Sequence, residues 1–171
     1  MTTTGATLTG HGTVIATAGF SNDMGGAITA EQQLNLIGDI DNAGTITVAA
    51  GGELRCFGTL EDSGSIALQA NSVGSLEAVA SGQTITFAGN HAKLVLRNPG
   101  AFSGAINGFG LTHSIELEAE ATVPNFASGV LTLTVPPGKV VAQLQMQGPF
   151  PYTTLNFHVA PGLSSVITFV P

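Results

Sequence analysis

The chain has 171 residues, 43% hydrophobic and only 9% charged, with 4 Lys or Arg against 11 Asp or Glu and a net charge of −7. This length favours one domain with ample material for a core, and the charged fraction is far below the usual quarter. An acidic chain without a basic cluster lacks the positively charged patch that binding to nucleic acid or to an anionic membrane requires. No apolar run approaches the length of a membrane span.

The amino-terminal stretch lacks the marks of a cleaved secretory signal. Met1–Gly5 has neither a basic region nor an apolar core, and the first basic residue is Arg55. Residues 1–11 are rich in Thr and Gly with one apolar point, Leu8, and are predicted to form an arm that docks onto a neighbouring molecule. A first strand is expected over 12–18, and a loop over 20–26.

The central part of the chain repeats itself. The segment Gly38–Val48 is echoed by Gly58–Leu68 with an offset of 20 residues, so that glycines and aliphatic side chains recur at matching places. A period near 20 with short alternating apolar runs is typical of a solenoid, whose coils bury their apolar side chains against one another. Residues 12–128 are therefore predicted to form a parallel β-helix, an all-β fold that climbs about 4.8 Å per coil.

Two series of apolar pairs define the repeat. Each pair has the in-out-in pattern of a strand, and Gly, Asn and Asp separate the pairs as turns require. The first series is Leu34/Leu36, Leu54/Cys56, Leu76/Ala78, Leu94/Leu96 and Ile115/Leu117, and the second is Ile46/Val48, Ile66/Leu68 and Ile85/Phe87, with Ile106 as a weaker fourth member. These side chains are expected to stack in the core.

The outward positions beside the two series differ in charge. Those beside the first series mix both signs: Asn35, Glu53, Arg55, Ser75, Glu77, Lys93, Val95, Ser114 and Glu116. Those beside the second series are uncharged: Thr45, Thr47, Ser65, Ala67, Thr84 and Thr86. Threonine is favourable on any exposed strand. The uncharged face is therefore either ordinary strand surface or a flat surface that packs against another molecule.

The last third of the chain changes in character. Four strands are expected, over 130–135, 140–146, 154–159 and 165–170, with a hairpin turn at Pro136–Gly138 between the first two. Residues 129–171 are predicted to form an antiparallel β cap or assembly segment. Such a cap would cover the last coil, whose edge would otherwise template aggregation.

A set of motifs from Lys93 onward suggests a family. In chain order they are Leu94–Leu96, Asn98–Gly110, Ser114–Leu117, 129–135, 141–144, 152–157 and 166–168. The sequence from Lys93 onward resembles the C-terminal β-solenoid region of large secreted proteobacterial surface proteins, namely autotransporter-like or haemolysin-type adhesins. The resemblance implies export to the extracellular space or cell surface, often by a type I system with an uncleaved C-terminal signal.

The chain also departs from that family. It is very short, and it has Leu111–His113 where the family usually has a Gly-Asp turn and Pro136–Gly138 where it usually has Asp and Gly. A surface protein of this size cannot reach far by itself, which favours an assembly of many copies.

The strongest acidic cluster consists of Asp39, Asp41, Glu61 and Asp62. The repeat predicts that Asp41 lies near Glu61 and that Asn42 lies near Asp62 on adjacent coils. Stacked carboxylates could bind Ca²⁺ or act as the acid/base pair of a glycosidase or lyase. The glycine-aspartate nonapeptide of calcium-binding β-rolls is absent. We therefore interpret the cluster as solvated turns and expect neither a metal nor a cofactor.

The remaining reactive residues do not form a motif. His11, His91, His113 and His158 have no metal-ligand spacing, and Cys56 falls in an inward apolar series, where a small buried hydrophobe is expected. No nucleophile elbow, phosphate loop or Cys-x-x-Cys occurs. Phe150 and Tyr152, which lie among prolines, are read either as core or as an exposed binding spot. No catalytic residue is expected, and the chain is not predicted to be an enzyme.

The leading functional hypothesis is an exported structural β-solenoid that associates with itself into a filament, a surface layer or a biofilm matrix. The residues assigned to self-association are Leu8, Thr45, Thr47, Ser65, Thr84, Thr86, Phe150 and Tyr152. The second hypothesis is an adhesin or glycan-binding module whose partner is a cell-surface glycan, and the third is a carbohydrate-active enzyme. An ice-binding protein is a fourth, suggested by the Thr-x-Thr pairs but interrupted at Ser65-x-Ala67.

Overall fold

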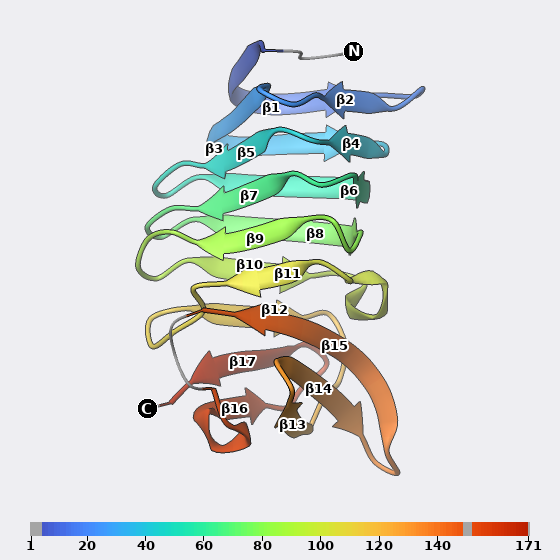
Figure 1. Ribbon diagram of the computed structural model, residues 1–171, viewed down its shortest axis with the longest axis vertical. Helices are drawn as coiled ribbons and strands as arrows, with labels where there is room; N and C mark the ends of the chain where they lie inside the picture. Colours follow the sequence, from blue (N-terminus) through green and yellow to red (C-terminus); the bar gives the residue numbers. More distant parts are fainter. Residues whose placement is uncertain (1–4, 149–151, 171) are drawn as a thin grey trace.

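The computed structural model describes residues 5–148 and 152–170, and almost all of its regular structure is β-strand (Figure 1). About six coils of roughly 20 residues stack along one axis, which confirms the predicted β-solenoid. The strands of the coils are β1 (Thr7–Ile15), β2 (Phe20–Asn22), β3 (Ala27–Ile37), β4 (Ile40–Asn42), β5 (Thr45–Val48), β6 (Glu53–Glu61), β7 (Ser65–Leu68), β8 (Val73–Val79), β9 (Thr84–Phe87), β10 (Lys93–Leu96), β11 (Ala105–Asn107) and β12 (Ser114–Leu117), and the short 3₁₀ helix η1 (Pro99–Ala101) lies between β10 and β11.

Parallel pairing between neighbouring coils gives the solenoid three sides. The side that we call the threonine face contains the first halves of β1 and β3, then β5, β7, β9 and β11. The charged face contains the second halves of β1 and β3, then the first part of β6, β8, β10 and β12. The short side contains β2, β4 and the ends of β6 and β8, and it finishes with a single bridge between Val79 and Phe102.

The core is a set of stacked aliphatic columns. On the threonine face, Ile46, Ile66, Ile85 and Ile106 follow one another from coil to coil and are all buried, as the second apolar series predicted. Ile28, which was not assigned to that series, pairs with Ile46 and extends the column into the first coil. Such columns arise because every coil places a β-branched or aliphatic residue at the same inward position, where only the neighbouring coils can cover it.

One pair of the first apolar series was assigned to the wrong register. Cys56 pairs with Leu76 and Leu54 pairs with Gly74, so the inward pair of this coil is Gly74/Leu76 and not Leu76/Ala78. Ala78 instead pairs with Thr59 on the short side, beyond an irregularity in β6. A Cβ atom built on Gly74 would lie 2.9 Å from Cδ2 of Leu68, which occupies the space that a side chain would need.

Buried amides form a hydrogen-bonded ladder inside the solenoid, at the end of the short side. The Asn22 amide donates to Asn42 Oδ1 at 2.7 Å, and the Asn42 amide donates to Gln83 Oε1 at 2.8 Å. The Gln83 amide in turn donates to the backbone oxygens of Asn42 and Glu61, at 2.7 and 2.5 Å. All three amide side chains are fully buried, and hydrogen bonding offsets the cost of removing them from water.

An antiparallel cap covers the C-terminal end of the solenoid, as expected. Its elements are β13 (Val123–Ala127), β14 (Val130–Val135), β15 (Lys139–Gln147), the 3₁₀ helix η2 (Thr154–Asn156), β16 (Phe157–Ala160) and β17 (Ser165–Phe169). The end of β15 continues the threonine face beyond β11 in parallel, while β17 closes the charged face by pairing antiparallel with β12. Both exposed edges of the last coil therefore find a strand partner.

The boundaries of these parts differ from the expected ones at both ends. Residues 7–10 pair with 27–30 in parallel, so this part of the expected arm over 1–11 belongs to the first coil. The cap includes β13, which begins at Val123 and precedes the expected boundary at 129. Residues 154–156 are a 3₁₀ turn and not the start of a strand.

The thiol of Cys56 is expected to be inert in the folded protein. The side chain is buried in the core, and burial raises its pKa to about 12 because the thiolate would lose its hydration. An aromatic disulfide reagent such as DTNB should therefore react negligibly with the native protein near neutral pH and should titrate one thiol after denaturation. Rapid labelling of the native protein would place Cys56 outside the core.

Candidate functional site

The threonine face is a regular array without charge. Its outward positions form two columns that run from the first coil to the cap: Thr7, Ala27, Thr45, Ser65, Thr84, Ala105 and Gln145, and beside them Thr9, Thr29, Thr47, Ala67, Thr86, Asn107 and Gln147. The six residues assigned to this face from the sequence thus lie together. Thr7, Thr9 and Thr29 belong to the same columns and were missed, although the 20-residue offset from Thr9 to Thr29 signals them.

The opposite character marks the charged face. Its outward columns are Glu53, Val73, Lys93 and Ser114, and beside them Arg55, Ser75, Val95 and Glu116. Arg97 and Glu118, which follow β10 and β12, extend this surface and were not assigned from the sequence. Three of the four basic residues of the chain, Arg55, Lys93 and Arg97, are therefore gathered on one side.

The basic side chains of the charged face are all ion-paired. Arg55 Nε lies 2.7 Å from Glu53, Lys93 pairs with Glu116, and Arg97 Nε lies 3.3 Å from Glu77. The Arg97 guanidinium also covers the Phe57 ring, 4.6 Å from its centroid. These half-exposed pairs contribute roughly 0–1 kcal/mol each to stability. The same surface holds a shallow hollow of about 500 Å³ whose lining includes both carboxylates and cations.

The repeat predicted the positions of the residues in the acidic turns only in part. Asp41 and Glu61 are register partners on adjacent coils, as expected. Asn42 is not beside Asp62 at the surface; it is buried in the amide ladder, while Asp62 is exposed and adopts a left-handed conformation with φ 68°. The Asp39 carboxylate accepts a hydrogen bond from the Thr59 backbone at 2.9 Å. The acidic residues of this cluster therefore belong to separate turns, and their carboxylates do not meet at one site.

Chelators are expected to leave the fold intact. Within residues 5–148 and 152–170, no group of three or more His, Cys, Asp or Glu side chains could hold a metal ion. The melting temperature in EGTA or EDTA should therefore equal that in buffer with added Ca²⁺. A loss of several degrees in chelator that Ca²⁺ restores would contradict this expectation and point to the acidic turns.

Two of the histidines lie near one turn but do not form a reactive pair. The His113 ring stacks on Phe87 with centroids 4.8 Å apart, and its Nδ1 atom is buried without a hydrogen-bond partner. Burial and, secondarily, the nearby His91 lower the pKa of His113, because both oppose its protonation. His91 adopts φ 58° at an exposed turn. Such an arrangement suits a packed imidazole better than a ligand or general base.

Of the two aromatic residues assigned to self-association, Phe150 and Tyr152, the structure describes the position of Tyr152. Phe150 lies outside the described residues. Tyr152 is half-buried in the cap, where its ring contacts Phe126, Phe157 and Phe169. Its hydroxyl donates to the Phe109 backbone oxygen at 2.7 Å. These contacts give Tyr152 a role in fastening the cap to the last coil.

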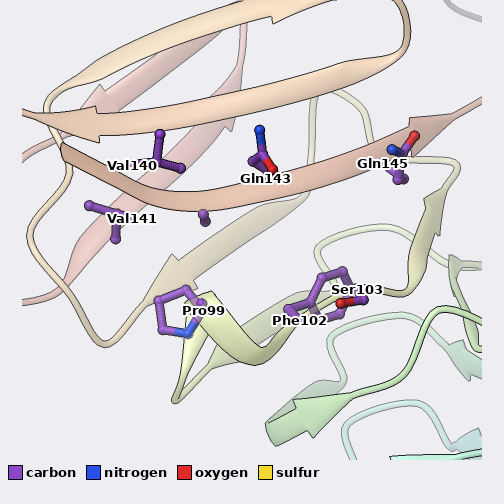
Figure 2. A pocket seen from close by; sticks show the side chains of 9 residues that line it. Pro99, Phe102, Ser103, Val140, Val141, Gln143 and Gln145 are labelled. Atoms are coloured by element: carbon purple, nitrogen blue, oxygen red, sulfur yellow. The ribbon is translucent and has the colours of Figure 1, made fainter. Parts of the chain in front are cut away.

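A second hollow lies between η1 and β15 and has a volume of about 360 Å³. Figure 2 shows Pro99 and Phe102 on one side of it and Val141 and Gln143 on the strand that faces them. Its lining combines aliphatic side chains and the Phe102 ring with the Ser103 hydroxyl and the amides of Gln143 and Gln145. None of the lining residues is a His, Asp, Glu, Lys, Cys or Tyr that could serve as a general acid or base.

Comparisons with protein-family models, with curated proteins and with solved structures found no match for this chain. The resemblance to secreted surface proteins therefore stays a prediction. In the described ranges, no helix is long and apolar enough to cross a membrane.

Proposed function

We propose that the chain is a structural, self-associating β-solenoid of the extracellular space or cell surface, in which copies join into a larger assembly. The observation that supports this most is the difference between the two ends of the solenoid. The last coil is closed by β15 and β17, whereas β1, among the residues described, pairs with β3 of the second coil alone. An unpaired strand edge is a template for another strand.

The surface chemistry supports the same proposal. The threonine face presents a flat and uncharged surface over the whole length of the solenoid, which imposes little repulsion on a neighbouring copy. The charged fraction of 9% and the absence of a convergent site in the described residues also favour a structural role over catalysis. Export, and incorporation into a filament, layer or matrix, belong to this proposal.

The test is the mass of the purified chain in solution over a range of concentrations. Sedimentation velocity and light scattering should give species heavier than one chain, and negative-stain microscopy should show elongated particles. A chain that stays monomeric at the highest accessible concentration would remove the structural proposal and favour a module that acts alone.

A second candidate is a glycan-binding module, and the hollow on the charged face favours it. Carboxylates and guanidinium groups can together hydrogen-bond several sugar hydroxyls, and Arg55, Lys93 and Glu116 line one continuous surface. The test is titration of the protein with neutral, acidic and sulfated oligosaccharides, with Arg55→Ala as the variant. Saturable binding that Arg55→Ala abolishes would support this candidate, and the absence of binding would remove it.

A further inference from the structure

The hollow on the charged face adjoins a second hollow. The two share Arg97 and Glu118, and the second has a volume of about 510 Å³. It lies where the last coil meets the cap, lined mainly by residues 97–100, by residues 118–120 after β12 and by residues 139–141 of β15. We call the two hollows together the long groove, which runs from the charged face onto the cap.

The first part of the long groove lies low because short side chains stand between long ones. The strand β8 places Val73 and Ser75 in the outward columns, whereas the coils on either side place Glu53, Arg55 and Lys93 there. Ser75 faces outward and is nevertheless only 8% exposed, so it lies beneath the longer side chains around it. Short side chains thus form the floor, and charged side chains form the walls.

Ion pairing holds the donors and acceptors of the walls in place. Arg55 Nε donates to Glu53 at 2.7 Å. Arg97 Nε lies 3.3 Å from Glu77 and 3.9 Å from Glu118. A guanidinium group has five N–H donors and a carboxylate has about four acceptor sites, so a single contact uses a small part of this capacity. Each pair presents N–H donors directly beside carboxylate oxygens.

The charges along the long groove cancel. Its four carboxylates belong to Glu53, Glu116, Glu118 and Glu120. Its four cations belong to Arg55, Lys93, Arg97 and Lys139. A polyanion that approached one of the cations would meet a carboxylate next to it, and a polycation would meet the reverse. The groove therefore attracts neither, although the whole chain has a net charge of −7.

Sugar hydroxyls suit such a lining, because each hydroxyl both donates and accepts. Of two neighbouring hydroxyls on a sugar ring, one can donate to the Glu53 carboxylate while the other accepts from the adjoining Arg55 guanidinium. Hydrogen bonds to charged groups are roughly twice as strong as neutral ones. The C–H groups of the ring can lie on aliphatic side chains, namely Val73 in the first hollow and Val140, which is 50% exposed, in the second.

The size of the long groove favours a chain of sugars over a single ring. Each hollow has the volume of a whole small-molecule site, roughly 300–1,000 Å³, and the two meet at Arg97 and Glu118. We propose that the long groove binds a linear, uncharged polysaccharide whose consecutive sugar units run from the charged face past Arg97 onto the cap. This inference rests on the glycan-binding candidate and names the class and the path of its ligand.

Titration with charged and uncharged polysaccharides tests the ligand class. Calorimetry of the full chain with dextran, mannan and galactan should give saturable binding to at least one of these neutral polymers, and added salt should barely change the affinity. Dextran sulfate and alginate should bind more weakly. Binding of the charged polymers alone, lost as salt screens the charges, would overturn the uncharged class and leave glycan binding standing.

A double variant tests the charge balance. Glu116→Gln with Glu118→Gln keeps the side-chain shapes and removes two of the four negative charges from the groove. It should weaken binding of the neutral chain by roughly tenfold or more and add salt-sensitive binding of dextran sulfate. The matched control is Asp41→Asn with Glu61→Gln, which removes two exposed negative charges from the short side. Identical behaviour of the two double variants would overturn the groove as the site.

Two single variants test the path. Lys139 lines only the second hollow, so Lys139→Ala should weaken binding of a long chain and leave a short oligosaccharide in the first hollow unaffected. Arg97→Gln, at the junction, should weaken binding of both ligands while circular dichroism shows a folded chain. If Lys139→Ala bound long chains as tightly as the parent, the path onto the cap would be wrong.

The outcomes separate this inference from the proposals on which it builds. If no saccharide of any charge binds at the highest accessible concentration, the long groove and the glycan-binding candidate both fail. Self-association is measured independently by the mass of the chain in solution and is not affected by that result.

Discussion

Replacing Ile66 with aspartate is expected to unfold the protein. The Ile66 side chain is fully buried, between Ile46 and Ile85 of the adjacent coils. A carboxylate there would have to be buried without a partner or be neutralised, at a cost of several kcal/mol. The whole stability of a domain is only about 5–15 kcal/mol. The circular dichroism spectrum of Ile66→Asp should therefore lose its β signal, or its melting temperature should fall by tens of degrees.

The matched control is Ala67→Asp. Ala67 is the next residue of β7 and faces outward on the threonine face, where it is half-exposed. The same charge at this position meets water and should change the free energy of unfolding by less than about 0.5 kcal/mol. If Ile66→Asp melted at the same temperature as Ala67→Asp, the inward register of β7 would be refuted.

The second large effect is expected at the buried amide ladder. Asn42→Ala removes the acceptor of the Asn22 amide and the donor to Gln83, so two buried polar groups lose a partner. Each unsatisfied group costs about 1–3 kcal/mol, and members of a buried network depend on one another. Urea unfolding should therefore show a loss of about 2–5 kcal/mol with an unchanged m-value.

Asn90→Ala provides the comparison. Asn90 is exposed at a turn, so water can replace any hydrogen bond that its side chain makes, and the expected change is within about 0.5 kcal/mol. Equal losses for the two variants would mean that the ladder contributes nothing beyond an ordinary surface amide.

Much of this fold can be predicted from the sequence because the repeat is local. Columns such as Ile46, Ile66 and Ile85 can be predicted from the spacing of these residues in the chain alone. Gly74 could not be placed in this way: a residue without a side chain leaves no apolar signal, and its space is filled by Leu68 from another face. Leu76 and Ala78 satisfied the same alternation, so the pattern by itself allowed the wrong pair.

The parts that were missed depend on contacts between distant segments. The strand β13 begins Val123-Pro124-Asn125 and was not expected, because a proline within a short run argues against a strand; it nevertheless pairs with β14. The burial of the Asn42 side chain could not be predicted locally, because its amide donates to Gln83, 41 residues later in the chain. The gathering of Arg97 and Glu118 on the charged face follows from the stacking of coils and not from any local motif.

The order of the coils along the chain has a consequence for how the protein is made. Each coil pairs with the coil that precedes it, so a chain that emerges from the ribosome or an export channel with its amino terminus first can add coils one at a time onto a surface already formed. The cap strands β13–β17 follow all the coils in sequence. Until they arrive, the growing edge can accept a coil of another chain, and the speed of synthesis relative to cap docking sets how often chains become entangled.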